Sequence, residues 1–210
     1  MTTIDDATAA SECVGRRERK KRETRLSIRR AALELALERG VDRLTVEEIA
    51  EAADVSPRTF FNYFSCKEDA LVMDAAIGEL RTLIRERPAG EPPLDTLRAA
   101  ITSSGMLGAA TMNREQVSSR HRLVSANPSL VPRQMAQYEA VEREMAEAVG
   151  ERLGLDPDVD LRPALLAAVA AGAVRVALRR WTADGSRLLV EQIESAFDLL
   201  SSSELNAAGR

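Results

Sequence analysis

The side chains best suited to chemistry in this chain of 210 residues gather in one stretch, VSPRTFFNYFSCKEDAL, residues 55 to 71. Arg58 can form two parallel hydrogen bonds to the edge of a guanine, and Thr59 offers a hydroxyl to a base or phosphate and a methyl group to thymine. Tyr63 and Lys67 lie farther along, with groups that bind phosphate. Together these residues favour a contact with nucleic acid, provided that the surrounding elements present them on one face.

A first helix and a second short helix are predicted before this stretch. The first has apolar residues at helical spacing and is expected to end at Gly40, which suits a left-handed C-terminal cap. Thr45 and Glu48 then form a capping box, which predicts a helix over residues 46 to 53. The start of this second helix also places Thr45 within reach of phosphate.

A turn separates the second helix from a third. Asp54 supplies the turn, Ser56 the N-cap and Pro57 the first position of the new helix. A further capping box at Ser65, or one residue later at Cys66, predicts the start of a fourth helix. Two short helices joined by a tight turn, with cations on the second, form the geometry that enters a major groove.

Helices of about eight residues are too short to be stable alone, so they must share a core. Phe60 and Phe64 are four residues apart and are expected to face that core. Phe61, Asn62 and Tyr63 face elsewhere, and packing of Tyr63 on the fourth helix is the alternative to a DNA contact. The predicted core positions are Leu44, Val46, Ile49, Ala50, Ala53, Val55, Phe60 and Phe64. The residues predicted to contact DNA are Arg25, Thr45, Ser56, Pro57, Arg58, Thr59, Phe61, Asn62, Tyr63 and Lys67.

Positive charge is concentrated just before this region. Residues 16 to 30 carry nine Arg or Lys and two Glu, a net of +7, so the other 195 residues sum to −11 in a chain of net charge −4. An acidic body repels polyanions, so a basic segment on it indicates a local phosphate-binding arm. A solvated helix start with no partner is the alternative.

Residues 20 to 75 resemble the DNA-binding domain of the TetR family of bacterial transcriptional regulators. The resemblance rests on AALELALERG, TVEEIAEAADVSPRTFFNYF and CKEDAL, which follow one another in the family's order. Asp54 stands where the family often has Gly, and Asp tolerates the turn conformation. Ala36 stands where the family often has an aromatic residue, which favours Leu37 or Phe61 as the side chain that fills the core instead.

The resemblance implies an all-α fold with an N-terminal three-helix helix-turn-helix domain and a larger helical domain for ligand binding and dimerisation. We expect a disordered basic tail over residues 1–19, the DNA-binding domain over 20–66 and the second domain over 67–205. Helices in the second domain are predicted at 66–87, 93–103, 105–111, 113–126, 128–152, 160–182 and 186–203.

The resemblance further implies a homodimer that reads a palindromic operator, with its last two helices forming the dimer interface. Gly172 lies in the middle of an Ala-rich helix, where it lets another helix approach closely. Burial of the same faces within one chain is the alternative. The predicted interface residues are Ala168, Gly172, Arg175, Val176, Leu189, Ile193 and Phe197.

A small effector is expected to release the DNA, as is usual for repressors of this family. The second domain has few aromatic residues and several Met, which suits flexible apolar ligands. Two segments, SSRHRLVSANPSLVPRQM and LRPALLAAVAAGAVRVALRRW, loosely resemble regulators that bind acyl-CoA-like ligands, so we expect an acyl-CoA or fatty acid. A regulator of drug efflux is the alternative. The predicted ligand residues are Met73, Met106, Met112, Arg120, His121, Arg122 and Met135.

Other functional classes find little support in the chain. Cys13 and Cys66 are too few for a disulfide framework, and His121 is the only histidine, so no metal site or cofactor is expected. No nucleophile elbow or phosphate loop supports an all-helical enzyme or lipid carrier, the remote alternative. The longest apolar run, residues 163 to 174, is short for a membrane span. The two cysteines and a start without the apolar stretch of a secretory signal fit a reducing cytoplasm, so we expect a cytoplasmic protein.

Overall fold

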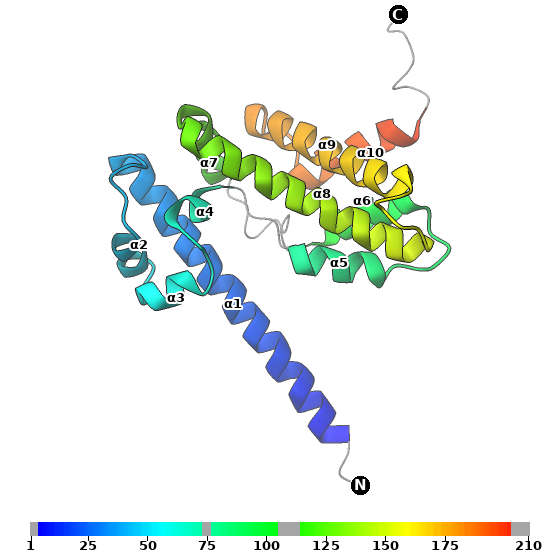
Figure 1. Ribbon diagram of the computed structural model, residues 1–210, viewed down its shortest axis with the longest axis horizontal. Coiled ribbons are helices and arrows are strands. Elements are labelled where there is room, and N and C mark those ends of the chain that lie inside the picture. The colour runs from blue at the N-terminus through cyan, green and yellow to red at the C-terminus, as the bar shows by residue number, and fades with distance from the viewer. Residues whose placement is uncertain (1–3, 73–76, 105–113, 203–210) are drawn as a thin grey trace, which may run out of the picture. The chain divides into compact units, whose positions relative to one another are not determined.

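The structure is a computed structural model and describes residues 4–72, 77–104 and 114–202. These parts contain ten α-helices and one 3-10 helix, and no strand (Figure 1). The predicted all-α class is confirmed. The chain divides into two compact units, the first from the N-terminus to Val72 together with Ala126–Leu130, and the second made of the rest.

The first unit contains α1 (Ile4–Arg39), α2 (Val46–Ala52), α3 (Pro57–Phe61) and α4 (Lys67–Leu71). Gly40, with φ of 85°, ends α1 in the left-handed conformation that was predicted. Asp54 also takes a positive φ, 55°, in the turn between α2 and α3. Both turns therefore form as the sequence indicates, and they bring α2 into contact with α1 and with α3.

The core of the first unit confirms most of the predicted apolar positions. Phe60 is fully buried and Phe64 nearly so, whereas Val46 and Val55 are half-buried at the edge. Ala36 lies in the core, but Leu37 and Phe61 are 52% and 56% exposed, so neither fills the space beside it. The other buried hydrophobic residues of this core are Ile28, Ala31, Ala32, Leu33, Val41, Leu44, Ile49, Ala50, Ala53, Ala70, Leu71 and Val72.

Two local predictions in the first unit are wrong. Cys66 is the N-cap of α4, yet its side chain makes no capping hydrogen bond, so the expected capping box is absent. Helix α1 begins at Ile4 and therefore runs through most of the segment that was expected to be a disordered tail.

The second unit contains α5 (Ile77–Arg85), α6 (Pro93–Ser103), α7 (Arg114–Ala126), α8 (Val131–Leu153), α9 (Leu161–Ala183) and α10 (Leu189–Ser201). A 3-10 helix, Pro128–Leu130, precedes α8. The predicted segment 66–87 is thus two helices, α4 and α5, and the predicted segment 105–111 lies outside the described residues. Helix α9 packs between α8 and α10, and Ala-rich faces allow this close approach.

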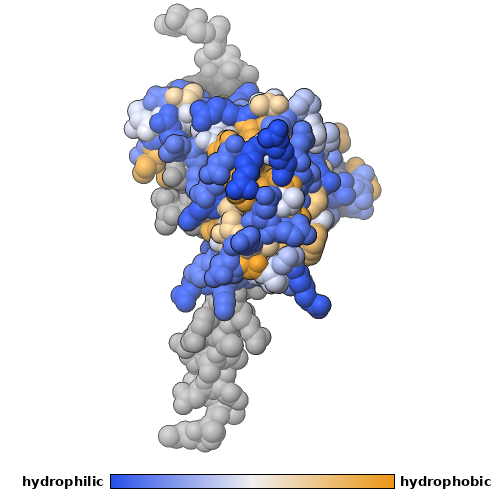
Figure 2. All heavy atoms as spheres, turned by 90° about the vertical axis from the view of Figure 1, so that its left-hand side faces the viewer, coloured by the Kyte–Doolittle hydropathy of each residue, from blue (hydrophilic) through white to orange (hydrophobic). Residues whose placement is uncertain are grey.

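Helix α9 is long and apolar enough by composition to cross a membrane. Core helices of globular domains pass the same test, and Ala167, Ala170, Ala173 and Ala177 of α9 are buried in the core of the second unit. The face of the molecule drawn in Figure 2 is mostly hydrophilic, with smaller apolar patches between charged side chains.

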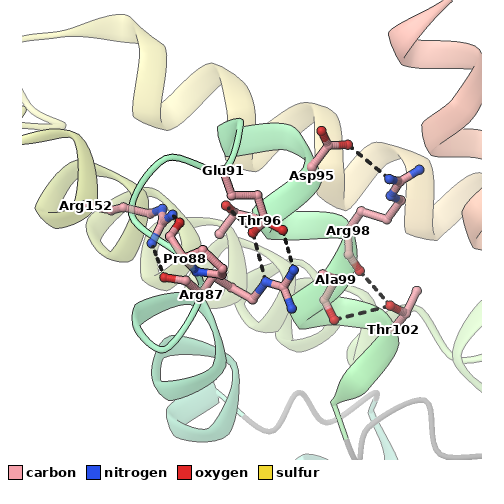
Figure 3. A network of polar contacts seen from close by, with 9 residues as sticks. All are labelled: Arg87, Pro88, Glu91, Asp95, Thr96, Arg98, Ala99, Thr102 and Arg152. Atoms are coloured by element: carbon pink, nitrogen blue, oxygen red, sulfur yellow. Dashed lines mark hydrogen bonds and ion pairs between the residues drawn. The ribbon is translucent and has the colours of Figure 1, made fainter.

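Polar contacts brace the loop between α5 and α6 (Figure 3). The Arg87 guanidinium donates to the carboxylate of Glu91, to which the hydroxyl of the buried Thr96 also donates, at 2.9 Å. These bonds, the one from Arg87 first, lower the pKa of Glu91 to about 2. Arg152 of α8 donates to the carbonyl groups of Arg87 and Pro88, so the loop is fixed to α8.

Candidate nucleic-acid interface and effector domain

Helix α3 is held so that one side of it is open to solvent. The Ser56 hydroxyl accepts from the Thr59 N–H at 3.0 Å and caps the helix, and Pro57 occupies the first turn as predicted. The Phe60 ring is buried, and its centroid lies 5.5 Å from that of Phe61 in a T-shaped pair. This anchor turns Phe61 outward, where it is exposed.

The exposed side of α3 carries groups that can read DNA. Arg58 and Asn62 are exposed, as are Pro57 and Phe61, whereas Thr59 and Tyr63 are half-buried. Arg58 offers the forked donors that match a guanine edge, and Asn62 offers an amide that matches adenine. The structure therefore places Arg58 on α3 and Asn62 at its C-cap, both exposed, with the half-buried Tyr63 directly after them.

Arg25 contacts the protein itself, and its predicted DNA contact stays a prediction. One of its Nη atoms donates to the Tyr63 carbonyl oxygen at 3.0 Å, and its guanidinium lies 4.5 Å from the centroid of the Phe64 ring. These contacts join α1 to the end of α3. Arg25 is thus a positioning residue for the reading helix.

The start of α2 is occupied by a carboxylate of the protein itself. The Thr45 N–H and hydroxyl both donate to Glu48, at 3.0 Å and 2.8 Å, and the Glu48 N–H donates back to the Thr45 hydroxyl. These hydrogen bonds lower the pKa of Glu48, with a further contribution from Arg39. In the protein alone the Thr45 donors are thus used beside a negative charge, and its contact with phosphate stays a prediction.

Lys67 is also engaged within the protein. Its Nζ donates to the carbonyl oxygens of Leu44 at 2.7 Å, Val41 at 3.0 Å and Asp42 at 3.4 Å. An ammonium group has three N–H donors, and all three face the turn between α1 and α2. Lys67 therefore ties α4 to this turn, and its phosphate contact stays a prediction that would have to compete with these carbonyl groups.

Sequence reasoning missed Arg29, which is only 5% exposed and donates to the Val72 carbonyl oxygen. It follows Arg25 by one turn, between the apolar positions Ile28 and Ala32. The position of Arg29 within this apolar stripe is a signal in the sequence, because a buried cation needs a polar partner.

The predicted effector residues are only partly described. Met73, Met106 and Met112 lie outside the described residues. His121 and Arg122 are exposed on α7, where Arg122 donates to the Ser119 hydroxyl at 3.1 Å, and Arg120 is half-buried. Met135 on α8 is 46% exposed, so the structure does not enclose these side chains together.

A polar cluster between α8 and α9 was not predicted as such. Arg175 forms an ion pair with Glu142 at 2.6 Å, and its guanidinium lies 5.7 Å from the centroid of the Tyr138 ring. Burial raises the pKa of Tyr138, and the charge of Arg175 partly opposes this. Tyr138 and Glu142 are four residues apart on α8, a spacing that the sequence does show.

The predicted dimer interface needs correction on α10. Leu189, Ile193 and Phe197 are 6%, 0% and 1% exposed, since they pack into the core of the second unit. They have almost no surface left for a partner. Intramolecular burial, the alternative given above, therefore holds for these three residues.

The interface residues predicted on α9, unlike those on α10, keep surface that is open to a partner. Ala168 and Val176 are exposed, Gly172 is half-exposed, and Arg175 is held by Glu142. Leu161 and Leu165, which were not predicted, are 82% and 63% exposed.

Among the described residues, no three His, Cys, Asp or Glu lie close enough together to hold a metal ion.

Comparison with known proteins bears on both units. Residues 28–72 match the family described as bacterial regulatory proteins, tetR family, and residues 91–204 match the family described as MftR C-terminal domain. The chain is 38% identical over 179 residues to the HTH-type transcriptional regulator TcmR of Streptomyces glaucescens, covering 80% of this chain and 76% of that protein. It is 27% identical to the putative mycofactocin biosynthesis transcriptional regulator MftR of Mycobacterium tuberculosis, covering 80% and 85%.

A solved structure shows the same fold. The fatty acid degradation regulator FadR from Bacillus halodurans is 20% identical and superposes with a TM-score of 0.51, covering 86% of this chain and 95% of that one. The helix-turn-helix geometry of α2 and α3, the all-helical second unit and these matches agree. The chain belongs to the TetR family of bacterial transcriptional regulators.

Proposed function

We propose that this regulator binds a palindromic DNA operator as a homodimer, represses transcription in the cytoplasm, and releases the operator when a mostly apolar small molecule binds its second unit. The observation that carries the DNA contact is the exposed side of α3, with Arg58 and Asn62 facing solvent above the buried Phe60. A buried aromatic anchor under exposed hydrogen-bonding groups fixes the helix that enters the groove.

The outer face of α9 supports the proposed dimer. Its open residues recur every three or four positions and so form one stripe: Leu161, Leu165, Ala168, Gly172 and Val176. An exposed apolar stripe of this length on a soluble domain marks a protein interface. A two-fold axis through this face would pair each stripe with its copy, and the resulting dimer would carry two α3 helices, one for each half-site.

The composition of the second unit supports an apolar effector. Its buried core consists mainly of Ala, Leu, Ile and Val, with Trp181 and Phe197 as the only aromatic members among the described buried residues. Flat cationic drugs are usually stacked on aromatic rings, whereas aliphatic linings suit flexible chains. An acyl-CoA or a fatty acid is therefore the proposed effector class.

Release would follow from a shift between two forms of the dimer. A ligand that binds better to a form with wrongly spaced α3 helices lowers the affinity for DNA, and DNA lowers the affinity for that ligand by the same factor.

An operator titration tests the proposed function. The operator is first selected by the wild-type protein from genomic fragments that include the region upstream of its own gene.

Acyl-CoAs, free fatty acids and cationic drugs are then added to the complex at fixed salt. We expect acyl chains to raise the apparent Kd for the operator and drugs to leave it unchanged. Release by drugs alone would replace the acyl effector with a drug-like one. Binding that fails to discriminate the selected operator from scrambled DNA would contradict the proposed function itself.

A further inference from the structure

Helix α1 extends the DNA-binding unit well beyond the reading helix (Figure 1). It begins at Ile4, and Arg25, much farther along, donates to the Tyr63 carbonyl oxygen just after α3. At 1.5 Å per residue, the part of α1 that precedes Arg25 is roughly 30 Å long. The basic segment is therefore part of a helix that is tied to α3, and its charges have fixed directions relative to that helix.

The exposed cations that precede Arg25 lie on different faces of α1. Lys21 and Arg22 precede Arg25 by four and three residues, so they lie within roughly 60° of it around the helix. Lys20 precedes Arg25 by five residues and lies roughly 140° away. Because Arg25 reaches the end of α3, Lys21 and Arg22 continue the face of α1 that is turned toward the reading helix.

The chemistry of this face suits a phosphate backbone. Lys21 and Arg22 are both exposed, and the segment from Arg16 to Arg25 contains no apolar residue. A helix that inserts into a membrane surface needs an apolar face, which this segment lacks. Helical side chains also lean toward the N-terminus, which directs these two cations away from α3 and along the axis of α1.

Resting on the proposed function, we propose that Lys21 and Arg22 form a second DNA contact, which binds phosphates just outside the half-site that α3 reads. The contact adds affinity without base specificity, since phosphates carry no sequence. The hydrogen bond from Arg25 to the Tyr63 carbonyl oxygen ties this part of α1 to the end of α3. The proposed contact therefore makes the footprint of each protomer longer than the segment read by α3 alone.

The salt dependence of binding tests this proposal. Full-length wild-type protein and the double variant Lys21→Gln with Arg22→Gln are titrated against a long operator duplex with about ten extra base pairs at each end. Gln resembles Lys and Arg in helix propensity, so α1 should persist. Each lost phosphate contact lowers the slope of log K against log salt by about 0.9, so we expect a decrease of roughly 1.8 per protomer and 3.6 per dimer.

The control removes the same charge from the opposite face of the same helix. Lys20 and Arg30 are both exposed, and each lies roughly 140° from Arg25, so the variant Lys20→Gln with Arg30→Gln should keep the wild-type slope. A short duplex, cut at the outer edges of the half-sites, should bind the wild type and the Lys21/Arg22 variant equally.

Three outcomes would overturn the proposal: an unchanged slope for the Lys21/Arg22 variant, an equal decrease for the control, or an equal loss on the short duplex. Failure of the proposed function is distinguishable from these. In that case the wild-type protein itself would bind operator and scrambled duplexes alike.

Discussion

Substitution of Lys67 by Met separates a structural role from a DNA contact. The side chain keeps its length but loses three donors to the carbonyl groups of Val41, Asp42 and Leu44, at 2.7 to 3.4 Å. A hydrogen bond from a charged group contributes about 1.5–3 kcal/mol. Because Lys67 is half-exposed and the 3.4 Å bond is long, we expect a total loss of about 2 kcal/mol in the free energy of unfolding.

For a chain of this size, that loss corresponds to a Tm lower by roughly 4–8 °C. Urea and thermal unfolding followed by circular dichroism measure it. Lys20→Met is the matched control, since Lys20 is exposed and its side chain should contribute less than about 0.5 kcal/mol.

The same variant is then titrated with operator DNA over a range of salt concentrations. The folded fraction should bind with the wild-type salt slope, because the Lys67 donors face the carbonyl groups of the turn between α1 and α2. Unchanged stability together with a slope reduced by about 0.9 per protomer would refute this reasoning and restore Lys67 as a phosphate contact.

Three other predictions concern the second unit. Leu165→Glu places a charge on the exposed stripe of α9, so it should leave folding intact and convert the dimer to a monomer in sedimentation equilibrium. The control Leu37→Glu, at a residue that is also exposed but lies on α1, should leave the dimer intact, and a dimeric Leu165→Glu protein would exclude the α9 face. Gly172→Ala should stabilise an isolated protomer by about 1 kcal/mol in urea unfolding, since the nearest atom to the new methyl group is 3.9 Å away. The same methyl group should weaken a close helix contact across the dimer, so tighter association of the variant would count against that contact. Glu91→Gln should lower the urea midpoint at pH 7. The pKa of Glu91 is lowered from 4.5 to about 2, so the carboxylate stabilises the fold above pH 4.5 and this advantage over the variant should fade as the pH falls toward 2; a constant gap down to pH 2 would show that the charge contributes nothing.

Local sequence signals predicted the helix-turn-helix part of the first unit well. The capping box of Thr45, the N-cap of Ser56 and the left-handed turn at Gly40 depend on neighbouring residues only, and all three form. The buried Phe60 and the exposed Arg58 follow from helical spacing, which fixes the face on which each residue lies. Short-range physics was sufficient for these features.

Long-range partners were not predictable in the same way. Lys67 meets carbonyl groups more than twenty residues earlier, and Arg25 meets one 38 residues later, so their roles depend on the tertiary fold. Leu189, Ile193 and Phe197 form one apolar stripe, and a stripe does not show whether its partner belongs to the same chain or to another. The sequence shows the charge or the apolar stripe, but the partner is supplied by the tertiary fold.

The most direct test of the central claim is the discrimination between operator and scrambled DNA by Arg58→Ala. A good bidentate contact to a base contributes about 1–3 kcal/mol of discrimination, so the ratio of the two affinities should fall by roughly 5- to 150-fold. Arg143→Ala, which removes an exposed cation from α8, should keep the wild-type ratio. Equal losses of affinity on operator and scrambled DNA for Arg58→Ala would contradict the account of α3 as the helix that reads the sequence.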